Sequence, residues 1–301
     1  MRYLSTRGGS PDVSLSEAMK AGLAPDGGLY VPEEIPRRHL GDFENCRTLP
    51  QTADRLLAPF FEGDELRPSL TAICNESFAI GAPLRAFGTG DDFLLELFHG
   101  PTAAFKDFGA QFLAACLAQL RKPQEPLLTV LVATSGDTGA AVAAAFHRRE
   151  GFRVVILYPE GRVSARQAHA LESFGDNVVT LRVAGSFDDC QRLVKRALAD
   201  RELQSSVALS SANSISLGRW LPQMTYFAAA ALGFFRDRQQ PLNFVIPTGN
   251  LGNATAAMLA RAMGLPIGRI VLSTNANDVL PRYFAGEDYS PAISVKTVAN
   301  A

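Results

Sequence analysis

The sequence lacks the patterns that mark disulfide-rich and metal-binding proteins. Its four cysteines, Cys46, Cys74, Cys116 and Cys190, are widely spaced, form no CxxC pair and have no histidine at ligand spacing. This usage is typical of buried thiols in a reducing compartment rather than of a disulfide framework or a zinc site. We therefore expect no metal and no disulfide.

The sequence also lacks a membrane or export signal and an excess of charge. No run of about 18 apolar residues occurs, so no transmembrane helix is predicted. The start, Met1–Arg7, has no apolar core of a signal peptide, which favours a cytoplasmic location. Lysine plus arginine (29) nearly balances aspartate plus glutamate (30), with a formal net charge of -1. Nucleic acid and anionic membranes are therefore not expected as partners.

What is present is an ordinary globular composition over 301 residues, with 47% hydrophobic and 20% charged residues. That length is enough for two domains with sizeable cores. We expect a mostly helical first domain over residues 1–80, in which Ser14 caps a helix that ends at Gly22. Residues 81–301 are expected to form an α/β region, with a small subdomain over roughly 110–220.

Beyond residue 81, near-continuous apolar runs alternate with helical patterns. The runs cover residues 127–133, 153–158, 178–183, 242–247 and 270–274. Two-sided apolar strands that alternate with helices predict open, mainly parallel sheets with flanking helices. Ligands of such sheets bind at the carboxyl ends of the strands, which is where the polar loops of this chain fall.

One lysine follows a break in regular structure. The apolar run 93–98 ends at His99–Pro101, and Thr102 is then predicted to cap a helix that carries Lys106 between two phenylalanines. Desolvation lowers the pKa of a lysine, and a partly neutral amine is what Schiff-base chemistry needs. The alternative is a side chain that packs along the phenylalanines and keeps its charge in water.

Three polar loops are candidates for anion binding. Residues 248–253, Thr-Gly-Asn-Leu-Gly-Asn, join a strand to a helix, where glycines and backbone N–H groups suit a phosphate. This loop matches neither the P-loop nor the dinucleotide GxGxxG pattern, which favours a phosphate without a nucleotide. The alternative is an ordinary strand-to-helix turn.

The other two loops gather hydroxyl groups. Residues 133–139 offer hydroxyls and backbone donors to a carboxylate, although Ser135 or Asp137 could simply cap the next helix. Residues 210–219 combine hydroxyls, an amide and an arginine, whose guanidinium matches phosphate oxygens. A solvated loop explains that third segment almost as well.

Taken together, the lysine and the three loops resemble a known arrangement. Residues 98–109, Phe-His-Gly-Pro-Thr-Ala-Ala-Phe-Lys-Asp-Phe-Gly, are similar to the cofactor-lysine motif of the threonine synthases, pyridoxal-phosphate enzymes of fold type II (the tryptophan synthase β family). Residues 3–8 and 22–32 resemble N-terminal motifs of the longer, bacterial and fungal-type members. The resemblance runs to the last residue of the chain.

The resemblance implies a role for each loop. Lys106 would hold pyridoxal 5′-phosphate as a Schiff base and move protons, and Asp137 would face the phenolic oxygen of the cofactor. The cofactor phosphate would be held by Gly249, Asn250, Leu251, Gly252 and Asn253. The substrate carboxylate would bind at Thr134, Ser135 and Thr138, with Thr138 also within reach of the substrate phosphate, and that phosphate would bind at Asn213, Ser214 and Arg219.

The chain departs from the family pattern in three places. Ser216 stands where longer members commonly have asparagine, and Leu251 stands where many have phenylalanine. The family also continues beyond residue 301, and residues 286–301 show no closing element, so we expect a C-terminally incomplete chain. No residue of this chain is assigned to the group that faces the pyridine nitrogen.

The resemblance implies conversion of the small-molecule substrate O-phospho-L-homoserine, with water, to L-threonine and phosphate, in threonine biosynthesis. Such an enzyme is a carbon–oxygen lyase that acts on a phosphate ester. Two alternatives stay open from the sequence: a threonine-synthase-like phospho-lyase that releases a keto acid, and a truncated relative that binds small molecules without turnover. An oligomer is possible on either reading.

Overall fold

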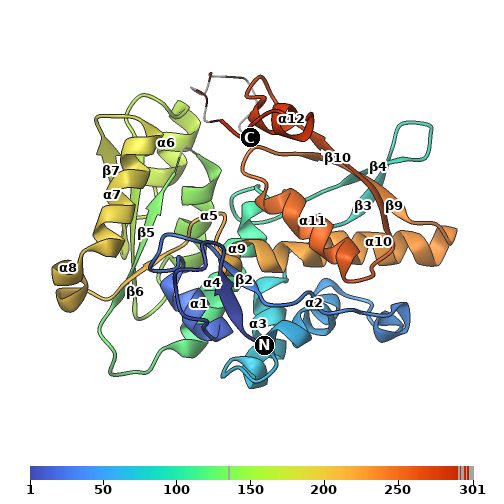
Figure 1. Cartoon of the computed structure of the whole chain (residues 1–301), viewed down its shortest axis with the longest axis horizontal. Coiled ribbons are helices and arrows are strands. Elements are labelled where there is room, and N and C mark those ends of the chain that lie inside the picture. Colours follow the sequence, from blue (N-terminus) through green and yellow to red (C-terminus); the bar gives the residue numbers. More distant parts are fainter. Residues whose placement is uncertain (135, 291, 293–294, 296, 298–301) are drawn as a thin grey trace.

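The computed structural model describes residues 1–134, 136–290, 292, 295 and 297 (Figure 1). Ser135 of the predicted site lies outside the described residues, and so do residues 298–301 at the end that the sequence predicted to lack a closing element. Among the helices of the described part, none combines the length and the apolar character needed to cross a membrane.

The first 80 residues are mostly helical, as predicted. The helix predicted after Ser14 is confirmed: Ser14 and Glu17 form a reciprocal capping box, and Gly22 ends the helix with φ of 72°. The elements are β1 (Tyr3–Ser5), α1 (Leu15–Ala21), β2 (Tyr30–Pro32), η1 (Leu40–Phe43), α2 (Leu49–Leu57), η2 (Ala58–Phe61), η3 (Arg67–Ser69) and α3 (Leu70–Ser77), with β1 and β2 antiparallel.

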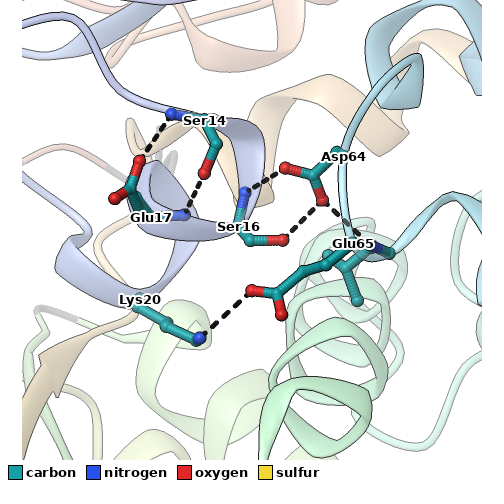
Figure 2. A network of polar contacts seen from close by, with 7 residues as sticks. Ser14, Ser16, Glu17, Lys20, Asp64 and Glu65 are labelled. Carbon is teal, nitrogen blue, oxygen red and sulfur yellow. Dashed lines mark hydrogen bonds and ion pairs between the residues drawn. The ribbon is translucent and has the colours of Figure 1, made fainter.

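A polar network ties α1 to the segment that follows η2. The backbone N–H and the hydroxyl of Ser16 both donate to the carboxylate of Asp64, and Lys20 lies 3.3 Å from a carboxylate oxygen of Glu65 (Figure 2). The partners are 48 and 45 residues apart in sequence. The network therefore fixes the position of α1 within the N-terminal unit.

Four parallel strands form one sheet in the order β7-β6-β5-β8, at the left of Figure 1. Three of these strands were predicted, whereas β8 was missed. The elements in chain order are β5 (Leu128–Ala133), α5 (Asp137–Phe146), β6 (Phe152–Pro159), α6 (Ala165–Glu172), β7 (Val178–Val183), α7 (Phe187–Ala199), α8 (Arg201–Ser206) and β8 (Leu209–Ser211).

A second group of elements lies at the right of Figure 1 and holds the other two predicted strands. β9 (Leu242–Pro247) and β10 (Ile267–Ser273) pair in parallel, and β3 (Leu84–Phe87) and β4 (Asp92–Leu95) form an antiparallel pair. The helices of this group are α10 (Met224–Arg238), α11 (Gly252–Ala262) and α12 (Val279–Phe284), and the short helices α9 (Leu217–Trp220) and η4 (Leu221–Gln223) lead into α10. The predicted α/β class with parallel sheets is therefore confirmed.

Helix α4 (Lys106–Leu120) lies at the centre of the molecule, between the two groups of strands (Figure 1). It packs against α1, α3, α5 and α9. Most of its residues are apolar and buried, and Gln119 near its C-terminus is exposed. Gly109 lets α9 approach closely, since a Cβ there would lie 2.4 Å from the carbonyl oxygen of Arg219.

The contact at Gly109 gives a stability prediction. Alanine favours a helix by about 1 kcal/mol over glycine, but overpacking a tight contact costs about 1–3 kcal/mol. We expect Gly109→Ala to lower the free energy of unfolding, measured by chemical denaturation. Gly233→Ala in α10 is the matched control, because nothing lies within 4 Å of its Cβ position. Equal stability of the two variants would contradict the close contact.

Candidate active site

Lys106 is the first residue of α4, so the predicted placement of the lysine at the start of a helix is confirmed. The predicted cap is wrong. The N-cap residue is Phe105, and no side chain caps the helix. The backbone N–H and the hydroxyl of Thr102 instead donate to the carboxylate of Asp107, at 3.0 and 2.6 Å. A turn that folds back on the helix therefore takes the place of a cap.

The amine of Lys106 is largely withdrawn from water. Its side chain is 18% exposed, and its Nζ lies 4.5 Å from the centre of the Phe105 ring. Burial lowers the pKa of Lys106 from its ordinary value, the carboxylate of Asp137 raises it, and the charge of Arg219 lowers it. The expectation of a lysine with a lowered pKa is therefore confirmed over that of a charge held in water.

Asp137 stands opposite that amine at the start of α5. Its carboxylate lies 3.8 Å from Nζ of Lys106, and Gln167 of α6 donates to it at 3.3 Å. The N-cap residue of α5 is Gly136, so Asp137 does not cap the helix. Because Asp137 follows β5 closely in the chain, this pair shows that the carboxyl end of β5 lies near Lys106.

The loop that follows β5 is held by one hydroxyl. Thr134 is buried, donates to the carbonyl of Gly136 at 2.9 Å, and accepts from the N–H groups of Gly136 and Gly139 at 3.1 and 3.0 Å. The hydroxyl therefore shapes the backbone at the start of α5. Binding of the substrate carboxylate by Thr134 and Thr138 stays a prediction.

The segment 210–219 is not the solvated loop of the alternative interpretation. Ser210, Ser211, Ser216 and Arg219 are all buried. Asn213 and Ser214 are half-buried, and the side-chain oxygen of Asn213 accepts from the N–H of Ile215 at 3.3 Å. The segment is therefore packed into the core at the carboxyl end of β8.

Arg219 is a wholly buried cation beside the lysine. Its Nη1 donates to the carbonyl of Ala212 at 2.6 Å, whereas its Nε and Nη2 have no hydrogen-bond partner among the described residues. Burial lowers its pKa to about 10, although the charge of Asp107 opposes that shift. A buried guanidinium with unused donors fits an anionic ligand nearby, such as a phosphate ester.

The glycine loop follows β9 as predicted, and its last residues open α11. Leu251 is the N-cap residue of α11 with a left-handed φ of 58°, and Gly249 and Asn250 are exposed. The N-terminus of a helix presents backbone N–H groups without intrahelical partners, which suits a phosphate. The geometry therefore agrees with a phosphate loop, and its ligand stays a prediction.

Two contacts bring this loop towards the lysine helix. A Cβ on Gly252 would lie 3.3 Å from the carbonyl oxygen of Ser214, so the glycine loop abuts the segment that leads to Arg219. The side chain of Asn253 accepts from Tyr226 at 2.6 Å, and the Tyr226 ring packs edge-on against Phe108 of α4 at 5.2 Å. The loops predicted from distant parts of the sequence therefore converge on the N-terminal half of α4.

Three residues that support the site were missed by the sequence reasoning. Asp107 follows Lys106 directly, and an acidic residue in the first turn of a helix after a Gly-Pro break was a usable signal. Gln167 and Tyr226 carry no such signal, because their contacts with Asp137 and Asn253 join residues 30 and 27 apart. Only the folded chain brings those pairs together.

Two family models match almost the whole chain. Residues 85–301 match a family described as pyridoxal-phosphate dependent enzyme, and residues 2–78 match one described as threonine synthase N terminus. Among curated relatives, the threonine synthase of Haemophilus influenzae is 41% identical over 96% of this chain. That of Escherichia coli is 38% identical over the full chain.

Solved structures give the same result. The chain superposes on threonine synthase from Escherichia coli with a TM-score of 0.90 and 37% identity, covering 100% of this chain and 70% of that one. It superposes on pyridoxal-phosphate-bound threonine synthase from Brucella melitensis with a TM-score of 0.87 and 36% identity, covering 99% and 65%. The chain spans 67% and 70% of the two curated relatives, about two thirds of their length.

The charges around the lysine give a prediction with a definite sign. Because the carboxylate of Asp137 raises the pKa of Lys106, we expect Asp137→Asn to lower that pKa further. The pH dependence of reductive methylation of Lys106, followed by peptide mass spectrometry with the exposed Lys122 as internal reference, measures it. Asp188→Asn is the control, since Asp188 is an exposed acid in the first turn of α7. An unchanged or raised pKa in Asp137→Asn would contradict the pairing.

Proposed function

Because the chain belongs to the threonine synthases, a family of pyridoxal-phosphate-dependent enzymes, we propose that it converts O-phospho-L-homoserine and water to L-threonine and phosphate. The observation that carries the proposal is the largely buried amine of Lys106, whose pKa is lowered by burial and by the charge of Arg219 against the opposing effect of Asp137. The cofactor, when bound, withdraws electrons from the substrate carbon that loses a proton. The residues of the chain supply binding, orientation and proton transfer.

Lys106 holds the cofactor and moves the protons in this proposal. A lowered pKa leaves a larger share of the amine neutral, and a neutral Nζ can bond to an aldehyde carbon or accept a proton. Asp137 limits that effect, because its carboxylate favours the protonated amine that must later return the proton. A base placed in this way typically contributes about 10²–10⁴-fold to a rate.

The anionic groups of the ligands are assigned to two helix N-termini and one buried cation. The N-terminus of α11, with Gly249–Asn253, binds the cofactor phosphate. The N-terminus of α5, with Thr134, Ser135 and Thr138, binds the substrate carboxylate, and Asp137 faces the phenolic oxygen of the cofactor. Asn213 and Ser214 bind the substrate phosphate. Arg219 adds positive charge as that phosphate departs, an effect strengthened by its exclusion from water.

The proposal extends to domain organisation and location. Residues 1–80 act as a support that packs α1 and α3 on α4, and residues 81–301 carry the site, with the small subdomain over roughly 110–220. All four cysteines are free and buried, which supports a cytoplasmic location.

The assignment of the lysine has a direct test. We expect Lys106→Ala to abolish the aldimine absorbance that purified protein retains after incubation with pyridoxal phosphate and removal of the unbound cofactor, because the retained absorbance requires a covalent bond between the cofactor and an amine of the protein. Lys122→Ala is the control and should keep it, since Lys122 is exposed and lies beyond the C-terminus of α4. Absorbance that persists in Lys106→Ala would refute the assignment.

The reaction itself is tested by its products. Incubation of the loaded protein with O-phospho-L-homoserine should release phosphate and L-threonine in equal amounts, measured by a phosphate assay and amino-acid chromatography. Release of ammonia and 2-oxobutanoate in place of threonine would instead identify a phospho-lyase. Binding of the cofactor without any phosphate release would identify a relative that does not turn over this substrate.

A further inference from the structure

Asp107 is a buried acid whose function the proposed reaction does not explain. It lies in the first turn of α4, directly after Lys106, and its side chain is almost wholly buried. A buried carboxylate is costly unless it is hydrogen-bonded or paired with a charge. Asp107 accepts hydrogen bonds from the preceding turn, and its charge acts on the buried Arg219.

The hydrogen bonds hold the turn of residues 100–105 against α4. The Asp107 carboxylate accepts from the N–H and the hydroxyl of Thr102. Gly100 is required for this approach, because a Cβ there would lie 2.4 Å from a carboxylate oxygen of Asp107. The side chain of Asp107 therefore holds the turn that precedes Lys106 against the start of α4.

The clamped turn is a strained one. Ala103 has a φ of 54°, in the left-handed region that residues with a Cβ rarely adopt because their Cβ is crowded by the backbone. Its N–H donates to the carbonyl of Gly100 at 3.1 Å, and the N–H of Asp107 donates to the carbonyl of Ala104 at 3.0 Å. Such a conformation persists only where surrounding contacts enforce it.

Asp107 also acts on Arg219 through its charge. Its charge raises the pKa of the buried Arg219, and the charge of Arg219 in turn lowers the pKa of Lys106. Asp107 therefore stabilises the cation that lies beside the reactive amine, in addition to fixing the backbone from which that amine extends.

We propose that Asp107 is a positioning residue for Lys106: its carboxylate clamps the turn of residues 100–105 onto α4 and so holds the lysine amine in its buried place. The inference rests on the proposed function, because it assigns Asp107 a part in the work of Lys106. Asp107 itself touches neither the cofactor nor the substrate in this scheme, and it acts through the backbone of its neighbour.

Thr102→Val tests the clamp without changing any charge. The variant removes the shorter of the two hydrogen bonds to Asp107 and keeps the shape of the side chain and the backbone N–H. Thr71→Val is the matched control, because the Thr71 hydroxyl donates to the carboxylate of Asp54 at 3.0 Å on an exposed part of the N-terminal unit. Each variant thus loses one threonine–aspartate hydrogen bond.

A loosened turn should change the amine in a predictable direction. Because burial is the main cause of the lowered pKa of Lys106, we expect Thr102→Val to raise that pKa towards its ordinary value of 10.5. The measurement is the pH dependence of reductive methylation of Lys106 in cofactor-free protein. We also expect kcat to fall by on the order of tenfold to a hundredfold, as for a misplaced catalytic group. Thr71→Val should change neither quantity.

The outcomes separate this inference from the proposed function. If Thr102→Val and the second clamp variant, Gly100→Ala, fold but leave the pKa of Lys106 and kcat unchanged, the clamp is refuted. Gly90→Ala is the control for the glycine change, since nothing lies within 4 Å of its Cβ position. If instead Lys106→Ala keeps the aldimine absorbance, the proposed function itself fails, whatever the clamp variants do.

Discussion

The structure depends on the burial of one mostly apolar helix. Most residues of helix α4 are buried, and the helix is covered by α1 and α3 of the N-terminal unit, by α5 and by α9. Its first residue, Lys106, therefore lies where these parts meet. Each polar loop of the site is carried by an element that packs against α4 or against a neighbour of α4. Packing against the apolar surface of α4 thus brings the polar loops of the site together.

Charges of both signs lie around Lys106. Asp137 and Asp107 carry carboxylates, and Lys106 and Arg219 carry the cationic side chains. The guanidinium and the loss of water both favour the neutral amine, whereas Asp137 favours the charged one. Burial and the charge of Asp137 therefore act in opposite directions on the pKa of this amine. The proposed role of Lys106, which both accepts and returns a proton, makes use of both effects.

The elements with strong local signals could be predicted from the sequence, and the contacts between them could not. Apolar runs predicted five strands, but the sequence signal was too weak for β8, whose three residues include two serines. Lys106 was predicted because it lies between two phenylalanines after a Gly-Pro break, within a segment that resembles the cofactor-lysine motif of the family. The bonding of Thr102 to Asp107 depends on the left-handed turn at Ala103, which no local pattern indicates. The burial of Arg219 depends on Gly109, three residues after the lysine, which admits the backbone of α9.

The contact between α1 and β8 has a consequence for the order in which the chain folds. The hydroxyl of Ser210, on β8, donates to the carbonyl of Lys20 at the end of α1, and these residues are 190 positions apart. At typical rates of about 5–20 residues per second, a ribosome needs roughly 10–40 s to synthesise that interval. During that time the side of α1 that packs against β8 in the folded chain has no partner strand. Newly made chains therefore expose this side of α1 until β8 has been made, after the Lys106 segment and the loop that follows β5 and before the loop that follows β9.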